Sequence, residues 1–316
     1  MRSRRSDRQA RVRRLTRVAA LAILSVAFAA LAFAASRPKT FATGDEAVNA
    51  FIKALREGNK EELLALFGSD ANDLISSGDK VADRQRMQTF VAYYDEQHKL
   101  DVEGDKLILL VGKNDWPFPI PLVKQGPRWV FDTAAGKEEI LNRRIGRNEL
   151  DTIQVMLAIV DAQREYAMRD RDGDGLREYA QKFRSDPGKK NGLYWETKEG
   201  EEPSPLGPLA AEARREGYFR DKSAAGPQPY RGYFYRILTA QGANAAGGAF
   251  DYIVNGKMIG GFAVIAYPAE YGNSGVMTFI VNHDGVVYQK DLGEDTEKEA
   301  QAMKRFDPDK TWTKAQ

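Results

Sequence analysis

The 316-residue chain contains no cysteine and only two histidines, His98 and His283. Without cysteine the protein has no disulfide framework, no thiol nucleophile and no lipid-anchored N-terminal cysteine. Two histidines that lie far apart in the sequence, with no thiol beside them, also exclude the usual ligand sets of zinc. The fold must therefore be stabilised by the burial of apolar side chains.

Long apolar runs are also scarce, and the one clear example extends from Val18 to Ala35 behind an arginine-rich start. A basic segment, an apolar run and the small-residue site Ala32-Phe33-Ala34 are typical of an export signal. We expect residues 1–35 to direct the chain to the periplasm. At this length the segment is either cleaved as a signal peptide or retained as an inner-membrane anchor formed by residues 18–35.

Positive charge is scarce once this segment is set aside. The first 40 residues hold ten Lys and Arg and one Asp, which leaves 37 basic and 44 acidic residues and a net charge of −7. A mildly acidic surface argues against nucleic acid or anionic lipid as a partner. We expect membrane contact only through the N-terminal segment, if it is not cleaved.

Residues 41–133 predict a first domain of three helices followed by a curved antiparallel sheet. Apolar residues recur at helical spacing after Thr43, a second helix starts at Asn59, and a third is expected over residues 83–98. His98 would then end the third helix, where its charge favours the helix dipole. Strands are predicted over residues 106–112, 118–123 and 128–132, and three prolines confine the middle strand to an edge or a bulge.

Residues 137–316 predict a second domain with a different order of elements. A long amphipathic helix is expected over residues 137–168, directly after the first domain. After a proline-rich loop, β-branched and aromatic runs separated by Gly, Asn and Asp predict an antiparallel meander at residues 233–239, 261–267, 276–282 and 286–290. The helix is the natural cover of this meander, so the fold class is α+β.

Two partial resemblances follow from these patterns. Three helices and a sheet ending in Arg128-Trp129-Val130-Phe131 resemble the cone-shaped domains of the nuclear-transport-factor-2-like superfamily, which implies a pocket between helices and sheet. The long helix and a meander containing residues 271–288 resemble the headgroup of type IV pilins and pseudopilins. Filament assembly is not implied, because this helix begins mid-chain and is amphipathic throughout.

A third resemblance spans both domains. Residues 73–79, 115–122, 136–150 and 266–275 are runs of unusual composition. They resemble the bacterial exported-protein family catalogued as domain of unknown function 2950. This resemblance implies export and one shared architecture, and it supplies no catalytic residues.

An acidic loop, residues 170–178, carries the sharpest local pattern. Carboxylates at alternate positions followed by Gly175 fold around a hard cation, and the loop predicts a structural Ca²⁺ site. Its ligands would be Asp170, Asp172, Asp174, the carbonyl of Leu176 and Glu178. The twelfth position, which holds a bidentate Glu in an EF-hand, is Gln181 here. The alternative is that the neighbouring Arg169, Arg171 and Arg177 neutralise the carboxylates without a metal.

A polar loop containing Glu270, Asn273 and Ser274 is the expected binding loop of the second domain. Ser274 lacks the G-x-S-x-G elbow, so a catalytic triad with His283 and Asp284 is not predicted. Aromatic residues, among them Trp116 and Phe118, either line a groove for a peptide or glycan or form the core.

These observations leave two functions open. The first is a non-catalytic binding or assembly module of the cell envelope, whose partner is an envelope protein or polymer. The second is a periplasmic hydrolase that uses a carboxylate pair. No catalytic residue can be named, and no cofactor other than the Ca²⁺ is expected.

Overall fold

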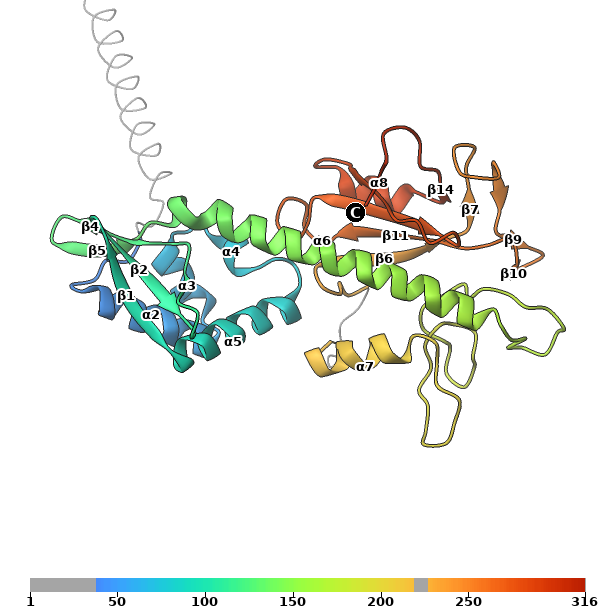
Figure 1. The fold of residues 1–316 in the computed structure, drawn as a ribbon, viewed down its shortest axis with the longest axis horizontal. Helices are drawn as coiled ribbons and strands as arrows, with labels where there is room; N and C mark the ends of the chain where they lie inside the picture. The colour runs from blue at the N-terminus through green and yellow to red at the C-terminus, as the bar shows by residue number, and fades with distance from the viewer. Residues whose placement is uncertain (1–37, 219–226, 316) are drawn as a thin grey trace, which may run out of the picture.

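The computed structural model describes residues 38–218 and 227–315, so the expected export signal at residues 1–35 lies outside the described residues. The described chain forms two hydrophobic clusters, and one long helix runs past both of them (Figure 1). None of the described helices has the combination of length and apolar character that membrane crossing requires. The elements confirm the α+β prediction, with helices and antiparallel sheets in both halves.

Four helices open the N-terminal half, and side-chain caps start three of them. The helices are α2 (Gly44–Glu57), α3 (Lys60–Phe67), α4 (Asn72–Ile75) and α5 (Lys80–Glu96). The side chains of Thr43, Asn59 and Asp79 accept hydrogen bonds from the first-turn amides of α2, α3 and α5. These caps explain why the helices begin where they do, and α5 begins three residues before the expected position 83.

The first sheet packs against these helices. It contains β1 (His98–Glu103), β2 (Lys106–Val111), β3 (Trp116–Pro117), β4 (Leu122–Gln125) and β5 (Arg128–Phe131). The order is β1-β2-β4-β5, and β3 pairs with the far end of β2. Pro119 and Pro121 lie in the segment between β3 and β4, so the single strand expected over residues 118–123 is interrupted there.

The prediction that His98 ends the third helix was wrong. α5 ends at Glu96, and His98 is the first residue of β1, an edge strand that the sequence did not reveal. The His98 ring stacks on Tyr94 with centroids 3.7 Å apart, and Nδ1 lies 2.8 Å from the Tyr94 carbonyl oxygen. The ring therefore still contacts the last turn of α5, although it lies outside the helix.

The long helix α6 (Thr133–Tyr166) connects the halves without a linker. It starts at the Asp132 side chain, which accepts a hydrogen bond from the Ala135 amide, and it ends near the expected residue 168. Gly136 in its first turn lies so close to the segment between β3 and β4 that a Cβ there would be 2.3 Å from the Pro119 carbonyl oxygen. The close approach fixes the N-terminal end of α6 against the first half.

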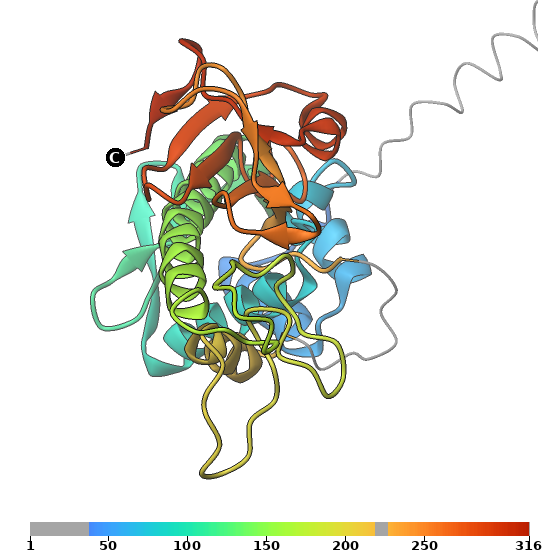
Figure 2. The ribbon, with the colours of Figure 1, turned by 90° about the vertical axis from the view of Figure 1, so that its right-hand side faces the viewer.

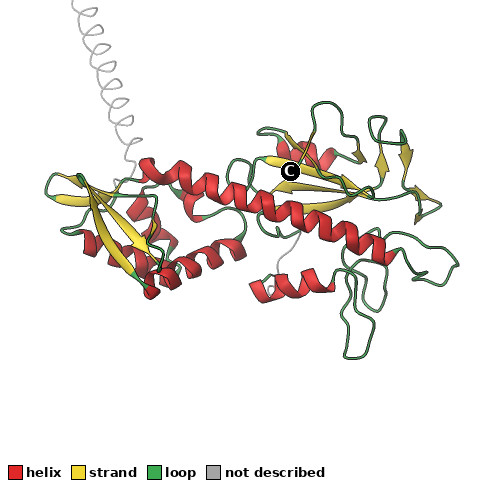
Figure 3. Ribbon diagram, viewed as in Figure 1, coloured by secondary structure: helices red, strands yellow, loops and turns green. Residues whose placement is uncertain are grey.

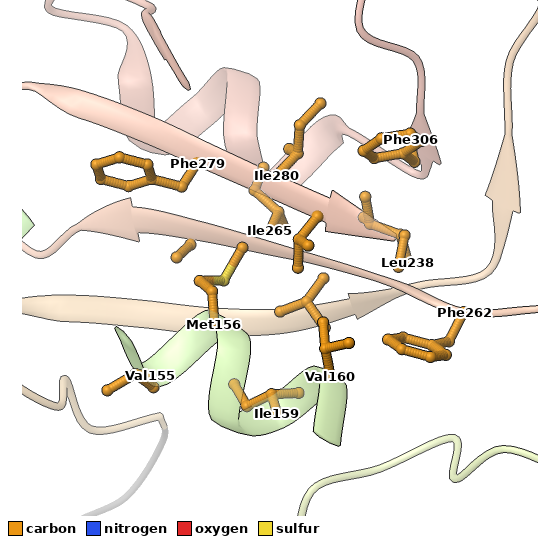
Figure 4. Close-up of a cluster of buried hydrophobic side chains, with 14 of the residues drawn as sticks. Val155, Met156, Ile159, Val160, Leu238, Phe262, Ile265, Phe279, Ile280 and Phe306 are labelled. Carbon is orange, nitrogen blue, oxygen red and sulfur yellow. The ribbon is translucent and has the colours of Figure 1, made fainter. Parts of the chain in front are cut away.

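The C-terminal half is built on the expected meander. Its main sheet has the order β15-β13-β12-β11-β6, and all of its pairs are antiparallel. The strands are β6 (Tyr233–Leu238), β11 (Ala263–Pro268), β12 (Met277–Asn282), β13 (Tyr288–Asp291) and β15 (Thr313–Lys314). Met156 and Val160 of α6 point into this core toward Ile265 of β11 (Figure 4).

Smaller elements surround this core. The helices are α7 (Gly207–Glu216), which lies across α6 from the sheet, and α8 (Thr296–Ala302), which contacts β11 (Figures 1 and 2). Two further small sheets contain β14 (Arg305–Phe306), β7 (Ala240–Gln241) and β8 (Phe250–Asp251), and β9 (Ile253–Val254) with β10 (Lys257–Met258). Long loops fill the chain between α6 and α7 (Figure 3).

Candidate functional site

A two-part cleft lies between α5 and α6. Its inner part is a pocket of about 230 Å³ inside the N-terminal half, and its outer part is a hollow of about 660 Å³. The two parts are contiguous, because both are lined by Arg86, Phe90, Trp116, Arg143 and Arg147. We call the inner part the apolar pocket and the outer part the arginine mouth.

The apolar pocket is formed by aromatic side chains from three separate segments. Phe51 of α2 stacks on Phe118 with ring centroids 5.0 Å apart, and Phe90 of α5 meets Phe118 edge to face at 5.2 Å. Ile140 of α6 closes one side. Such a concave, mostly apolar wall with polar groups at its opening is the usual form of a small-molecule site.

One face of α6 supplies a wall of both parts. The lining residues recur at intervals of three and four, as expected for a single helix face, and are Ile140, Arg143, Arg144, Arg147, Asn148 and Asp151. The apolar member lies at the pocket end and the charged members follow toward the mouth. The apolar periodicity of the sequence predicted this helix, but no local pattern indicated a role for its arginines.

The arginines of the mouth differ in how fully they are neutralised. Arg143 places its guanidinium 5.0 Å from the Trp116 ring and bonds Glu139 through an exposed 2.7 Å contact. Arg147 is exposed and forms no salt bridge with the carboxylates of the described chain. Exposed pairs such as Arg143 with Glu139 contribute little stability and exchange easily, so two guanidinium groups one helical turn apart are available to a ligand.

The carboxylates that line the cleft are already bonded to other groups. Asp83 accepts from the Ser77 amide at 3.0 Å, from the Ser77 hydroxyl at 2.7 Å and from Arg86. Asp151 and Glu216 lie 3.1 Å and 2.6 Å from the Arg231 guanidinium. Among the described residues that line it, the cleft therefore presents no carboxylate pair that is free to act on a substrate.

Arg144 ties the two halves together beneath the cleft. This buried side chain donates to the carbonyl oxygens of Asp73 and Leu74, each at 2.5 Å, and to the side-chain oxygen of Asn273. Burial, followed by the nearby positive charge of Arg86, lowers the pKa of Arg144 to about 10. One side chain on α6 thus joins α4 of the first half to the loop before β12 of the second.

Asp79 makes a second connection between the halves. Besides capping α5, its carboxylate accepts from the Tyr218 hydroxyl at 2.7 Å and from the Gly232 amide at 2.9 Å. Burial, and then the charge of Asp79, raises the pKa of Tyr218. Gly232 has a φ of +84°, and a Cβ there would be 2.5 Å from Asn148, so the close approach requires glycine.

The expected binding loop lies at this same junction. Asn273 and Ser274 are buried, and Asn273 donates to the Ser76 carbonyl at 2.8 Å and to Glu270 at 2.6 Å. The Ser274 hydroxyl accepts from the Glu270 amide at 2.9 Å. These polar atoms are thus engaged within the protein. Ser274 precedes β12 and His283 follows it, so the strand separates the two side chains.

In the acidic loop, three carboxylates come together and a lysine contacts two of them. One oxygen from each of Asp170, Asp172 and Asp174 lies within 4.8 Å of the others. The Lys257 ammonium contacts Asp172, lies 2.8 Å from Asp174 and lies 3.4 Å from Glu178. Hydrogen bonds that the ammonium donates to Asp172 and Asp174 raise the pKa of Lys257. The ammonium therefore contacts three of the residues that were expected to bind Ca²⁺. Binding of Ca²⁺ stays a prediction.

The alternative, neutralisation of this loop by Arg169, Arg171 and Arg177, does not hold for the first two. Arg169 and Arg171 bond Glu202 instead, at 2.8 Å and 2.9 Å. The Leu176 amide donates to Asp174 at 2.8 Å, which holds the backbone of the turn.

Residues 38–315 match the family described as "Protein of unknown function (DUF2950)", and the chain belongs to this family. No curated protein and no solved structure matches the chain. The likenesses to pilin headgroups and to nuclear-transport-factor-2-like domains therefore stay predictions.

Proposed function

We propose that this member of the DUF2950 family is a non-catalytic binding module of the cell envelope, and that its ligand occupies the cleft between α5 and α6. Export is supported by the arginine-rich start and the apolar run at residues 1–35. The observation that carries the binding role is the contiguity of the apolar pocket with the arginine mouth. A packed core without a ligand has no need of such an opening.

The alternative, a hydrolase with a carboxylate pair, has less support. Such an enzyme needs two carboxyl groups that face the same substrate bond. The candidates in the cleft, Asp83, Asp151 and Glu216, are instead bonded to arginines of the protein. The geometry thus favours recognition over acid–base chemistry.

The binding role can be tested with a neutral apolar dye, N-phenylnaphthylamine, whose fluorescence rises in an apolar site. We expect the purified protein to bind the dye and Ile140→Trp, which fills the apolar pocket, to abolish the rise. Leu150→Trp is the matched control, because Leu150 lies on the same helix, is 63 % exposed and does not line the cleft. If Ile140→Trp melts normally and still binds the dye as the control does, the cleft is not the ligand site.

Location is tested separately by fusing a reporter enzyme that is active only in the periplasm to the C-terminus. Activity of the full-length fusion, lost when residues 2–35 are deleted, is the expected result. An inactive full-length fusion that accumulates in the cytosol would contradict export.

A further inference from the structure

We infer that the ligand of the cleft is an amphiphile with an anionic head, whose alkyl chain enters the apolar pocket while its head binds Arg143 and Arg147. This inference rests on the proposed function and specifies the chemistry of its ligand. The juxtaposition that supports it is an apolar pocket of about 230 Å³ opening directly between guanidinium groups.

The pocket end of the site selects an apolar chain. Its lining comes mainly from hydrophobic side chains, including Leu55, Met87 and Phe90, and a polar ligand would lose its hydration there without gaining hydrogen bonds. Its small volume limits the chain to one of modest length. An alkyl chain gains about 0.8 kcal/mol for each CH₂ group that it buries.

The mouth selects an anion. Five arginines line the two parts of the cleft, against the three carboxylates Asp83, Asp151 and Glu216. Those carboxylates neutralise Arg86 and Arg231, and Arg144 donates to two carbonyl oxygens and to Asn273. Among the described residues of the cleft, Arg143 and Arg147 are left as the guanidinium groups with spare donors. This local excess of positive charge stands out against the net charge of −7 of residues 41–316. Carboxylate and phosphate groups fit the donor geometry of arginine, and both are anionic heads of biological amphiphiles.

The rim places the head close to where the chain must enter. Trp116 is 39 % exposed, contacts Phe90 at a ring-centroid distance of 6.4 Å and carries the Arg143 guanidinium over its face. An indole with one apolar face toward the pocket and a cation above it is suited to the boundary between a chain and its charged head. Buried Arg144 adds positive potential below the same rim, and burial, followed by the charge of Arg86, lowers its pKa.

The inference is tested by competition against the neutral dye, using decanoate, decyl phosphate and the uncharged decanol, each below its aggregation threshold. We expect an anionic probe to displace the dye at a concentration about tenfold lower than decanol, the ratio that one charge-assisted hydrogen bond provides. The two anionic probes distinguish a carboxylate head from a phosphate head. Tighter binding of either anionic probe than of decanol supports the inference. The ratio of the two affinities should fall as the salt concentration is raised.

Two substitutions give the matched comparison. Arg147→Gln should weaken the anionic probe about tenfold and leave decanol unchanged. Arg84→Gln removes the same charge from an exposed residue of α5 that does not line the cleft, and it should change neither probe. If decanol binds as tightly as both anions, or if Arg147→Gln behaves like Arg84→Gln, the anionic head is refuted. If Ile140→Trp still abolishes dye binding in that case, the binding role remains supported. Failure of the anionic head can thus be distinguished from failure of the proposed function.

Discussion

Replacing Arg144 with methionine tests whether this residue holds the two halves together. The substitution keeps an unbranched side chain at a site that is 6 % exposed, and it removes the donors to Asp73, Leu74 and Asn273. An unsatisfied buried acceptor costs about 1–3 kcal/mol. The variant also escapes the cost of burying a guanidinium, which offsets part of the loss. We therefore expect the free energy of unfolding to fall by about 3 kcal/mol.

Urea denaturation followed by far-UV circular dichroism measures this loss. Because Arg144 bridges the two hydrophobic clusters, we also expect Arg144→Met to split or broaden the unfolding transition. Arg147→Met, three residues further along α6 and exposed, is the control and should change stability by less than about 0.5 kcal/mol. A loss below about 1 kcal/mol for Arg144→Met, with a transition as sharp as that of the wild type, would refute the bridging role.

Three further predictions concern other parts of the fold. Gly136→Ala should destabilise the protein by about 1–3 kcal/mol because its Cβ meets backbone, whereas Gly146→Ala on the same helix, where nothing lies within 4 Å, should stabilise it by up to about 1 kcal/mol. Equal melting temperatures would contradict this. Lys257→Met leaves the acidic loop without its ammonium, so we expect the melting temperature of the variant to fall at low salt and to rise again with Ca²⁺. Ca²⁺ should raise the melting temperature of the wild type less. A variant whose melting temperature does not change with Ca²⁺ would argue against a metal site. Burial raises the pKa of Tyr166 and of Tyr230 to about 12. The unfolded chain releases these protons near pH 10, so this contribution to stability is present below pH 10 and is lost as the pH rises toward 12. Absorbance at 295 nm should therefore report the formation of tyrosinate at the same pH as unfolding. Gradual ionisation of these tyrosines in the folded protein would contradict the prediction.

The elements that the sequence predicted correctly are those with a strong local signal. Apolar periodicity marks α6, and β-branched runs separated by turns mark β6, β11 and β12. β1 was missed because it is an edge strand whose residues, His98–Glu103, are almost all exposed and show no alternation. A strand that is exposed on both faces has no alternation of apolar and polar residues by which it could be recognised in the sequence.

The cleft could not be predicted because its walls meet only in three dimensions. Phe51, Phe118 and Ile140 come from a helix, a loop and a second helix, and no local spacing relates them. The spacing of Arg143 and Arg147 beside Ile140 was the one available signal, and it reads equally well as a solvated helix face. The partner of the acidic loop was missed for the same reason, since Lys257 lies 85 residues beyond Asp172.

The continuous path of α6 through both halves restricts how the length of this protein can change. Each residue added to an α-helix turns everything beyond it by about 100° and moves it by about 1.5 Å. A one-residue insertion between Arg144 and Met156 would therefore swing the second sheet, and Asn273 with it, away from Arg144. Seven residues make nearly two whole turns, at about 3.6 residues per turn, and would restore the direction but not the distance. Insertions within DUF2950 proteins should consequently accumulate in the loops after Tyr166 and spare the helix itself.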